Sequence, residues 1–225
     1  MQNNFYISEP SVFAPGLDSV EDLRLFSQNK KEISYEKISP SLEYTDSLFR
    51  RRLSQLSKMT VEVVHSLIEK SHVSLDTKLV FVSFRGELER EFKINKEIIE
   101  SQMILPAGFS LSVFNAPVAL ATIACSLKAG YSAVFPEKEN FKYGLLSAAS
   151  SILSGAQEKI IFVYADELIP DCYKEVSPEN RPPLAFSYIV SKEKLPDLKS
   201  IEYSADDISE NVYDFIRLHI NKCYN

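Results

Sequence analysis

Two short segments are apolar on almost every residue, and they limit what this chain can fold into. Residues 159–164 read KIIFVY and residues 79–84 read LVFVSF, with the β-branched and aromatic side chains that favour strands. Because such strands have no polar face to turn toward water, both faces of their sheet must be covered, as in parallel sheets with helices on each side. The two segments therefore favour a layered α/β fold.

Segments with helical periodicity separate the expected strands. In residues 57–71 the apolar side chains recur at a spacing of about 3.6, with Ser57 or Thr60 placed to cap the first turn. We expect further helices over residues 87–99, 115–128, 137–153 and 206–222, and further strands over residues 5–7, 131–135 and 184–190. The alternation predicts one α/β domain over residues 1–225, with αβα layers and a mostly parallel sheet.

Acidic residues are expected to support one of these helices. Glu87 and Glu89 stand at the start of the segment 87–99, where a negative charge in the first turn complements the helix dipole. We therefore expect both carboxylates to lie near exposed backbone N–H groups.

The charge balance argues against a polyanionic partner. Lys and Arg number 25 against 31 Asp and Glu, which gives a net charge of −6 and no broad basic surface for nucleic acid or an anionic membrane. No apolar run reaches 18 residues, and the first eight residues lack the basic-then-apolar order of a signal peptide. We expect a cytoplasmic protein that binds neither nucleic acid nor membrane.

The motifs of several kinds of chemistry are missing from the sequence. Its 6 glycines include no GxGxxG or GxxxxGK arrangement, so a nucleotide site is not expected. The nearest approach to the GxSxG turn of serine hydrolases is residues 108–112, which lack the second glycine. His65 and His72 have no third ligand close by and are expected at the surface or at a cap. We predict no metal and no cofactor.

The three cysteines are poorly placed for catalysis. A reactive thiolate is favoured at a helix N-terminus or beside a positive charge. Cys125 falls late in an expected helix, Cys172 stands in an acidic loop beside Asp171 and Glu175, and Cys223 lies near the C-terminus. Their odd number and wide spacing also argue against a disulfide framework, so a reducing compartment suits them.

Six phrases follow one another along residues 5–175. They are VFAPG at 12–16, RRRLSQLSKM at 50–59, FVSFRGEL at 81–88, FSLSVFNAP at 109–117, GLLSAA at 144–149 and IIFVYADE at 160–167. Together they resemble the N-terminal half of the β-ketoacyl synthases, and most of all the short chain length factors of aryl polyene type II polyketide systems. The resemblance implies the N-terminal half of a thiolase fold, with residues 176–225 as a C-terminal extension.

This resemblance implies where a nucleophile would stand. In active ketosynthases a Thr-Ala-Cys-x-x-Gly turn presents the cysteine at the start of a buried helix. With the family glycine placed at Gly144, the nucleophile position falls on Phe141, which cannot attack a thioester. The two catalytic histidines of the family belong to a C-terminal half for which 225 residues leave no room. We therefore expect no catalytic residue in this chain.

The resemblance also implies a partner. Family members dimerise through the strand before the nucleophile position, so we expect a heterodimer with a ketosynthase, and the alternative is a strand buried within the sheet. An apolar edge without a charged residue would promote aggregation in a monomer. The expected interface residues are Asn115, Tyr131, Ser132, Ala133, Val134 and Phe135.

A second segment is expected beside the partner's acyl tunnel. In residues 105–115 a bulky side chain would limit chain growth by steric exclusion. Plain core packing is the alternative for Phe109 and Phe114. The residues expected to shape the tunnel are Gly108, Phe109, Ser112, Val113 and Phe114.

A basic run offers a contact for a further partner. Arg50, Arg51 and Arg52 carry charge complementary to an acidic acyl carrier protein, which a ketosynthase complex must receive transiently. The alternative is an ordinary solvated helix end.

These observations lead to one main hypothesis and two alternatives. The first is a non-catalytic chain length factor that stabilises a ketosynthase and shapes its acyl tunnel, with decarboxylative condensation carried out by the partner. The second is a small free-standing acyltransferase or thioesterase that uses Cys125 or Cys172. The third is a homodimeric scaffold.

Overall fold

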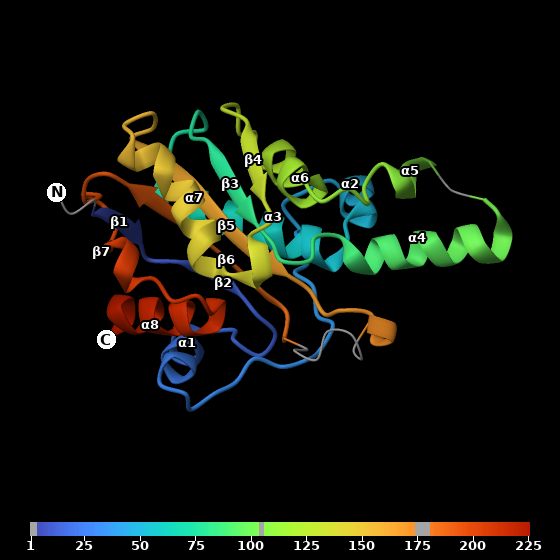
Figure 1. The fold of residues 1–225 in the computed structure, drawn as a ribbon, viewed down its shortest axis with the longest axis horizontal. Helices are drawn as coiled ribbons and strands as arrows, with labels where there is room; N and C mark the ends of the chain where they lie inside the picture. Colours follow the sequence, from blue (N-terminus) through green and yellow to red (C-terminus); the bar gives the residue numbers. More distant parts are fainter. Residues whose placement is uncertain (1–3, 104–105, 174–180) are drawn as a thin grey trace.

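A seven-stranded mixed sheet crosses the molecule in the computed structural model, which describes residues 4–103, 106–173 and 181–225 (Figure 1). The strand order is β4-β3-β5-β6-β1-β7, and β2 pairs with β6 outside this path. The strands are β1 (Phe5–Ser8), β2 (Ser11–Phe13), β3 (Leu79–Val82), β4 (Tyr131–Val134), β5 (Lys159–Asp166), β6 (Leu184–Ser191) and β7 (Ser200–Tyr203).

Helices cover both faces of this sheet. The α-helices are α1 (Val20–Ser27), α2 (Ser47–Arg52), α3 (Gln55–Ser71), α4 (Leu88–Ser101), α5 (Pro106–Phe109), α6 (Ala116–Ala124), α7 (Phe141–Leu153) and α8 (Val212–Tyr224). Three short 3₁₀ turns are η1 (Glu137–Glu139), η2 (Asp171–Tyr173) and η3 (Ala205–Asp207). Side chains of α3 and α6 pack in the core on one face, and those of α7 and α8 in the core on the other. The expected αβα layering is confirmed.

Alternation along β5 explains why both faces are covered. Ile160, Phe162 and Tyr164 point into the core under α7 and α8, whereas Ile161 and Val163 point into the core under α3 and α6. All five side chains are buried. A strand whose side chains are apolar on both faces is stable only where helices cover the sheet on both sides, as they do at β5.

The parallel pairing is concentrated in one part of the sheet. β3 pairs in parallel with β4 and β5, whereas β6 is antiparallel to β5, β1 and β2, and β7 is antiparallel to β1. The parallel core carries the crossover helices of the predicted α/β pattern. β6 lies in the middle of the sheet with all its residues buried, so this late segment belongs to the core.

Several helix boundaries differ from the prediction. Ser54, and neither Ser57 nor Thr60, caps α3, because its hydroxyl accepts from the Ser57 N–H at 2.9 Å. α6 ends before Cys125, since Ser126 adopts a left-handed φ of 57°. The expected helices 137–153 and 206–222 are each broken, with the 3₁₀ turns η1 and η3 standing apart from α7 and α8.

A buried aspartate at the end of β5 fixes the turn that follows β3. The Asp166 carboxylate accepts from the Ser83 hydroxyl at 2.7 Å, the Tyr164 hydroxyl at 2.6 Å and the Phe84 N–H at 3.0 Å. Burial raises the pKa of Asp166, although these hydrogen bonds oppose the shift. The turn continues through Gly86, whose φ of +58° suits glycine and whose Cβ position lies 2.6 Å from the Phe114 ring. The turn and the Phe114 segment are therefore packed together.

Candidate functional site

The predicted nucleophile position lies in the hydrophobic core. Phe141 is the first residue of α7 and is fully buried. Its ring packs against the four aromatic residues Phe162, Tyr164, Phe186 and Phe215, with centroid distances of 4.8–6.0 Å. Because the Phe141 N–H donates to the Glu210 carbonyl at 2.9 Å, it does not point freely at a substrate oxygen. This helix start offers neither a nucleophile nor that oxyanion donor.

The glycine used for this alignment makes a close contact. At Gly144, an added Cβ would lie 2.8 Å from the Val82 Cγ1 atom of β3. Only glycine fits between α7 and the sheet at this distance, which supports the placement of the family glycine at this residue.

Two of the three cysteines lack the surroundings of a nucleophile. Cys125 caps the C-terminal end of α6, and burial together with the negative Glu62 and Glu69 raises its thiol pKa to about 12. Burial likewise raises the pKa of Cys223 to about 11. Cys172 is exposed in η2, and its expected neighbour Glu175 lies outside the described residues. Cys125 and Cys223 therefore remain thiols at neutral pH.

The histidines have structural surroundings. His72 is exposed and caps the end of α3 with a left-handed φ of 49°, as expected for a cap, and half-buried His65 stacks on Tyr44 with 3.6 Å between ring centroids. His219 is fully buried in α8, where its Nε2–H donates to the Ser8 carbonyl at 2.8 Å and its Nδ1 accepts from the Tyr203 hydroxyl at 3.0 Å. Burial lowers the pKa of His219 to about 4.

We expect this histidine to make the fold acid-sensitive. An imidazole with a pKa of 6.5 when unfolded and about 4 when folded is neutral in the native protein, so unfolding takes up a proton as the pH falls through this range. Because buried carboxyls with raised pKa values titrate in the same range with the opposite effect, the contribution of His219 is measured as a difference from His219→Gln. In urea unfolding followed by tyrosine fluorescence, the unaltered chain should lose about 2 kcal/mol of unfolding free energy relative to His219→Gln between pH 7.5 and pH 5. The same pH dependence in both proteins would contradict the assignment.

Strand β4, the expected dimer strand, lies at the edge of the sheet. Within the described residues it pairs only with β3, so the alternative of a strand buried inside the sheet is wrong. The carbonyls of Gly130 and Val134 accept from the N–H groups of Leu79 and Ser83 at 3.2 and 3.4 Å. Because backbone groups alternate along a strand, the N–H and C=O of Ala133 face away from β3.

Side chains near this edge are apolar and exposed. Residues Tyr131 to Val134 are half-buried, and Phe135, which follows them, is 62% exposed. The expected neighbour Asn115 donates its side-chain N–H to the Tyr131 hydroxyl at 2.9 Å, which places it beside the strand. In Figure 1, α6 lies next to β4, and α5 lies farther from that strand. Three exposed apolar residues occur in this part of the chain: Phe109 at the end of α5, Val113 between α5 and α6, and Ile123 on α6. We call β4, Phe135 and these three residues the β4 edge surface.

The predicted tunnel residues separate into two groups. Phe109 and Val113 are 57% and 49% exposed and extend away from the core. Ser112 is buried and donates its hydroxyl to the Phe109 carbonyl at 2.9 Å. Phe114 packs between the rings of Phe81 and Phe135, which agrees with core packing for this residue. Gly108 is half-buried in α5, and Leu105 is outside the described residues.

The three arginines form the last turn of α2. Arg50 is half-buried and its Nη1 donates to the Leu42 carbonyl at 3.2 Å, so it is held by its own chain. Arg51 and Arg52 are exposed, and neither makes an ion pair with a residue that the structure describes. Two of the three guanidinium groups are therefore available to a partner.

Two buried carboxyl groups near these arginines were not foreseen. Glu87 is fully buried and accepts from the hydroxyls of Ser54 and Ser57 at 2.7 and 2.6 Å and from Arg90 Nε at 3.0 Å. Glu87 was expected in the first turn of a helix; it is instead the N-cap residue of α4, and its carboxylate makes no capping hydrogen bond. Burial, with the nearby Glu87, raises the pKa of Glu167 to about 8. The one feature of the sequence that could have pointed to Glu167 is its position directly after a parallel strand, where functional residues often lie.

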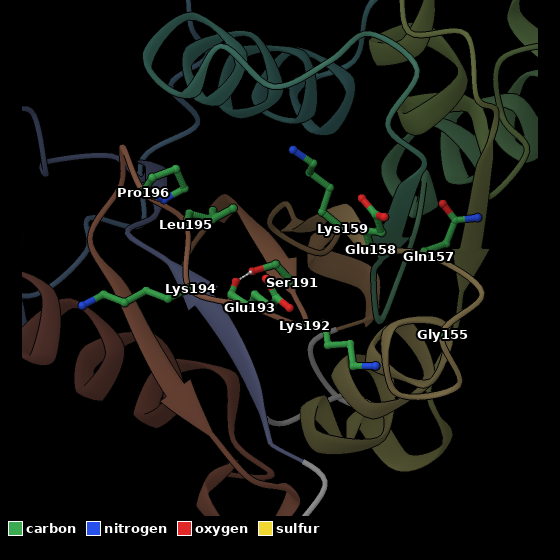
Figure 2. A pocket seen from close by; sticks show the side chains of 10 residues that line it. All are labelled: Gly155, Gln157, Glu158, Lys159, Ser191, Lys192, Glu193, Lys194, Leu195 and Pro196. Carbon is green, nitrogen blue, oxygen red and sulfur yellow. Dashed lines mark hydrogen bonds between the residues drawn. The ribbon is translucent and has the colours of Figure 1, made fainter.

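A further cavity lies at a different end of the sheet. About 500 Å³ in volume, it lies between the start of β5 and the segment after β6 (Figure 2). Its lysines Lys159, Lys192 and Lys194 extend in different directions and do not converge on one point. No group of three or more His, Cys, Asp or Glu that could hold a metal ion occurs in residues 4–103, 106–173 and 181–225. No helix in the same residues is long and apolar enough to cross a membrane.

Solved structures share this fold at low sequence identity. A structure of the ketosynthase ApeO in complex with its chain length factor ApeC from Xenorhabdus doucetiae contains a chain with a TM-score of 0.76 and 24% identity, covering 97% of this chain and 92% of that chain. The ishigamide ketosynthase/chain length factor gives 0.64 and 12%, covering 84% and 62%. A type II complex of the ketosynthase AntDE with the acyl-carrier protein AntF gives 0.65 and 14%, covering 85% and 64%.

These likenesses show the thiolase-like ketosynthase fold. A comparison with curated proteins found no match. The model of the beta-ketoacyl synthase N-terminal domain matches residues 25–213, which include β6, the beginning of α8 and five of the six segments that first suggested the resemblance. Because this match covers most of the sequence, the chain belongs to the beta-ketoacyl synthase N-terminal domain family.

Proposed function

We propose that this chain is a non-catalytic subunit that pairs with a ketosynthase and acts as its chain length factor. The observation that carries the proposal is the full burial of Phe141 at the start of α7, since the resemblance aligns this residue with the cysteine of active ketosynthases. Decarboxylative condensation of malonyl units would then depend entirely on residues of the partner. The family and the titles of the similar ketosynthase and chain length factor complexes support this class of partner.

The β4 edge surface is the proposed interface. An antiparallel strand of the ketosynthase added beside β4 would satisfy the outward backbone groups of Ala133 and continue the sheet across the complex. The exposed Phe135 ring and the side chains on α6 would be buried in the same step. Leaving this edge open favours aggregation, so pairing also explains how an apolar strand end is tolerated.

Phe109 and Val113 are the proposed contacts with the partner's acyl tunnel. Both side chains are exposed on the β4 edge surface. The segment that carries them is held by Ser112, which donates its hydroxyl to the Phe109 carbonyl, and by Phe114, which packs against Phe81. A large side chain that reaches the partner limits the space for a growing acyl chain, since close-packed cavities tolerate extra volume poorly. In this way the subunit would set product length in an aryl polyene or related pathway.

Arg51 and Arg52 are the proposed contacts for the acyl carrier protein. They are exposed and lack an ion pair among the residues of known position, whereas Arg50 is held by the Leu42 carbonyl. Two positive charges raise the rate of encounter with an acidic partner more than the final affinity. This contact would serve delivery of the acyl chain to the ketosynthase.

Co-expression with the ketosynthase encoded nearest to this gene tests the proposal. We expect a one-to-one complex on size exclusion and native mass spectrometry, and poor solubility of the chain without its partner. A homodimer of this chain would instead give a symmetric species that excludes the ketosynthase, because the same edge can pair with a second copy. A stable monomer with acyltransferase or thioesterase activity, lost on Cys125→Ala or Cys172→Ala, would establish the enzyme alternative.

A further inference from the structure

A second, smaller cavity lies beside Arg51 and Arg52. It has a volume of about 330 Å³ and is formed by Lys37, the junction of α2 and α3, the α4 surface, Gly108 and Glu167. This volume is near the lower end of the range for small-molecule sites, so the cavity suits a small ligand better than a protein segment. The cavity is separate from the larger one in Figure 2, with no lining residue in common.

Two buried side chains line this cavity, and each has an oxygen that accepts no hydrogen bond from the described residues. Glu167 is 5% exposed; one carboxyl oxygen accepts from the Leu56 N–H at 3.2 Å, and the other has no hydrogen-bond partner in the described part of the chain. Gln55 is 6% exposed and donates its amide to the Ile38 carbonyl at 2.7 Å, but its oxygen also lacks a donor there. A buried oxygen left in this way is costly unless a bound group supplies the hydrogen bond.

Positive charge surrounds these two oxygens. Lys37 and Lys93 both pair with Glu89, at 2.9 and 3.1 Å, and Arg90 pairs with the buried Glu87 at 3.0 Å. Of the cavity's charged groups, these pairings leave Arg51, Arg52, Glu97 and Glu167 without an ion pair among the described residues. Burial keeps the Glu167 carboxyl largely protonated at neutral pH, because its pKa is raised to about 8. The unpaired charge in the cavity is therefore net positive.

We propose that this cavity binds a small phosphate ester, with its phosphate against Arg51 and Arg52 and its hydroxyl or amide groups hydrogen-bonded to Gln55 and Glu167. Paired guanidinium groups suit a phosphate dianion, because each can present two parallel N–H donors. Hydroxyl and amide groups suit the inner end, since they donate to the Gln55 oxygen and can both donate to and accept from a protonated carboxyl. The proposal does not depend on the proposed function, because it requires no ketosynthase and no carrier protein.

Titration calorimetry with three probes tests the site. The probes are N-acetylglucosamine 6-phosphate, which carries phosphate, hydroxyl and amide groups, its unphosphorylated parent sugar, and inorganic phosphate. The full chain is used, as its complex if it purifies only in that form. We expect the phosphate ester to bind at least about tenfold more tightly than either of the other probes, because it engages both ends of the cavity.

Matched variants assign the binding to this cavity. Arg51→Ala/Arg52→Ala should weaken binding of the ester by at least about tenfold, since it removes two charge-assisted contacts. Lys192→Ala/Lys194→Ala removes the same charge at the larger cavity and should leave binding unchanged. Glu167→Leu should weaken the ester but not inorganic phosphate, and circular dichroism checks that this variant is folded.

Three results would overturn the proposal. The first is the absence of detectable binding for the ester. The second is equal affinity for the ester and inorganic phosphate, which indicates an adventitious ion only. The third is equal weakening by the arginine and lysine variants, which indicates a non-specific effect of charge.

Discussion

Replacing Ala133 with proline is expected to separate this chain from the proposed ketosynthase partner while leaving its own fold intact. The Ala133 N–H faces away from β3, as shown by the alternation set by the Gly130 and Val134 carbonyls. Proline removes that donor and places its ring where an added strand would lie. We expect at least about 30-fold weaker association, equivalent to ~2 kcal/mol, measured by surface-immobilised binding of the purified ketosynthase.

Two neighbouring substitutions control this experiment. Ala133→Ser keeps the outward N–H and should assemble normally. Ser132→Pro should destabilise the chain itself, because the backbone groups of this residue face β3 in the register that pairs Ser132 with Val80. Unchanged affinity of Ala133→Pro, with its circular dichroism spectrum preserved, would show that the partner binds elsewhere.

Phe141→Ala is expected to remove about 3–5 kcal/mol of unfolding free energy, the usual cost of deleting a fully buried phenylalanine. The ring is completely buried and contacts Phe162, Tyr164, Phe186 and Phe215, so neighbouring rings cannot close the space without losing their own packing. Urea unfolding of the purified variant at low protein concentration measures the change.

A residue in the same helical turn provides the comparison. Tyr143 is 56% exposed, so Tyr143→Ala should change the unfolding free energy by less than about 0.5 kcal/mol. Phe141→Leu should fall between the two, since it retains part of the volume. A loss below about 1 kcal/mol for Phe141→Ala would mean that Phe141 is not a core position in this chain.

The central strands could be predicted from sequence because their burial leaves a pattern in the residues themselves. β5 and β6 appeared as short apolar runs, and the structure extends them by only one or two residues. β2, β7 and α1 were missed. Each is short, and each is fixed by pairing or packing with residues far away in the chain, as β7 is by β1. Local periodicity carries little information about such contacts.

For the same reason, only part of the candidate site could be predicted from the sequence. Phe141 was singled out because the resemblance aligns the family glycine with Gly144, three residues later, and this glycine makes a close contact with Val82 in the structure. The inward orientation of Glu87 could not be predicted, since its partners Ser54 and Ser57 lie 30 or more residues earlier. Its sequence position before a helix favoured the commoner role of a charge near the helix dipole. Long-range hydrogen bonds decided its orientation.

Condensation by the assembled complex tests the central claim most directly. The ketosynthase is purified with the Cys125→Ala/Cys172→Ala variant of this chain, and product formation from malonyl-loaded carrier protein is compared with that of the unaltered complex. We predict rates within about twofold of each other, because the proposed role assigns no chemical step to either thiol and burial raises the pKa of Cys125 to about 12. Replacing the ketosynthase's own nucleophile should abolish the product. Loss of condensation in the cysteine variant, with the complex still assembled, would contradict a non-catalytic role.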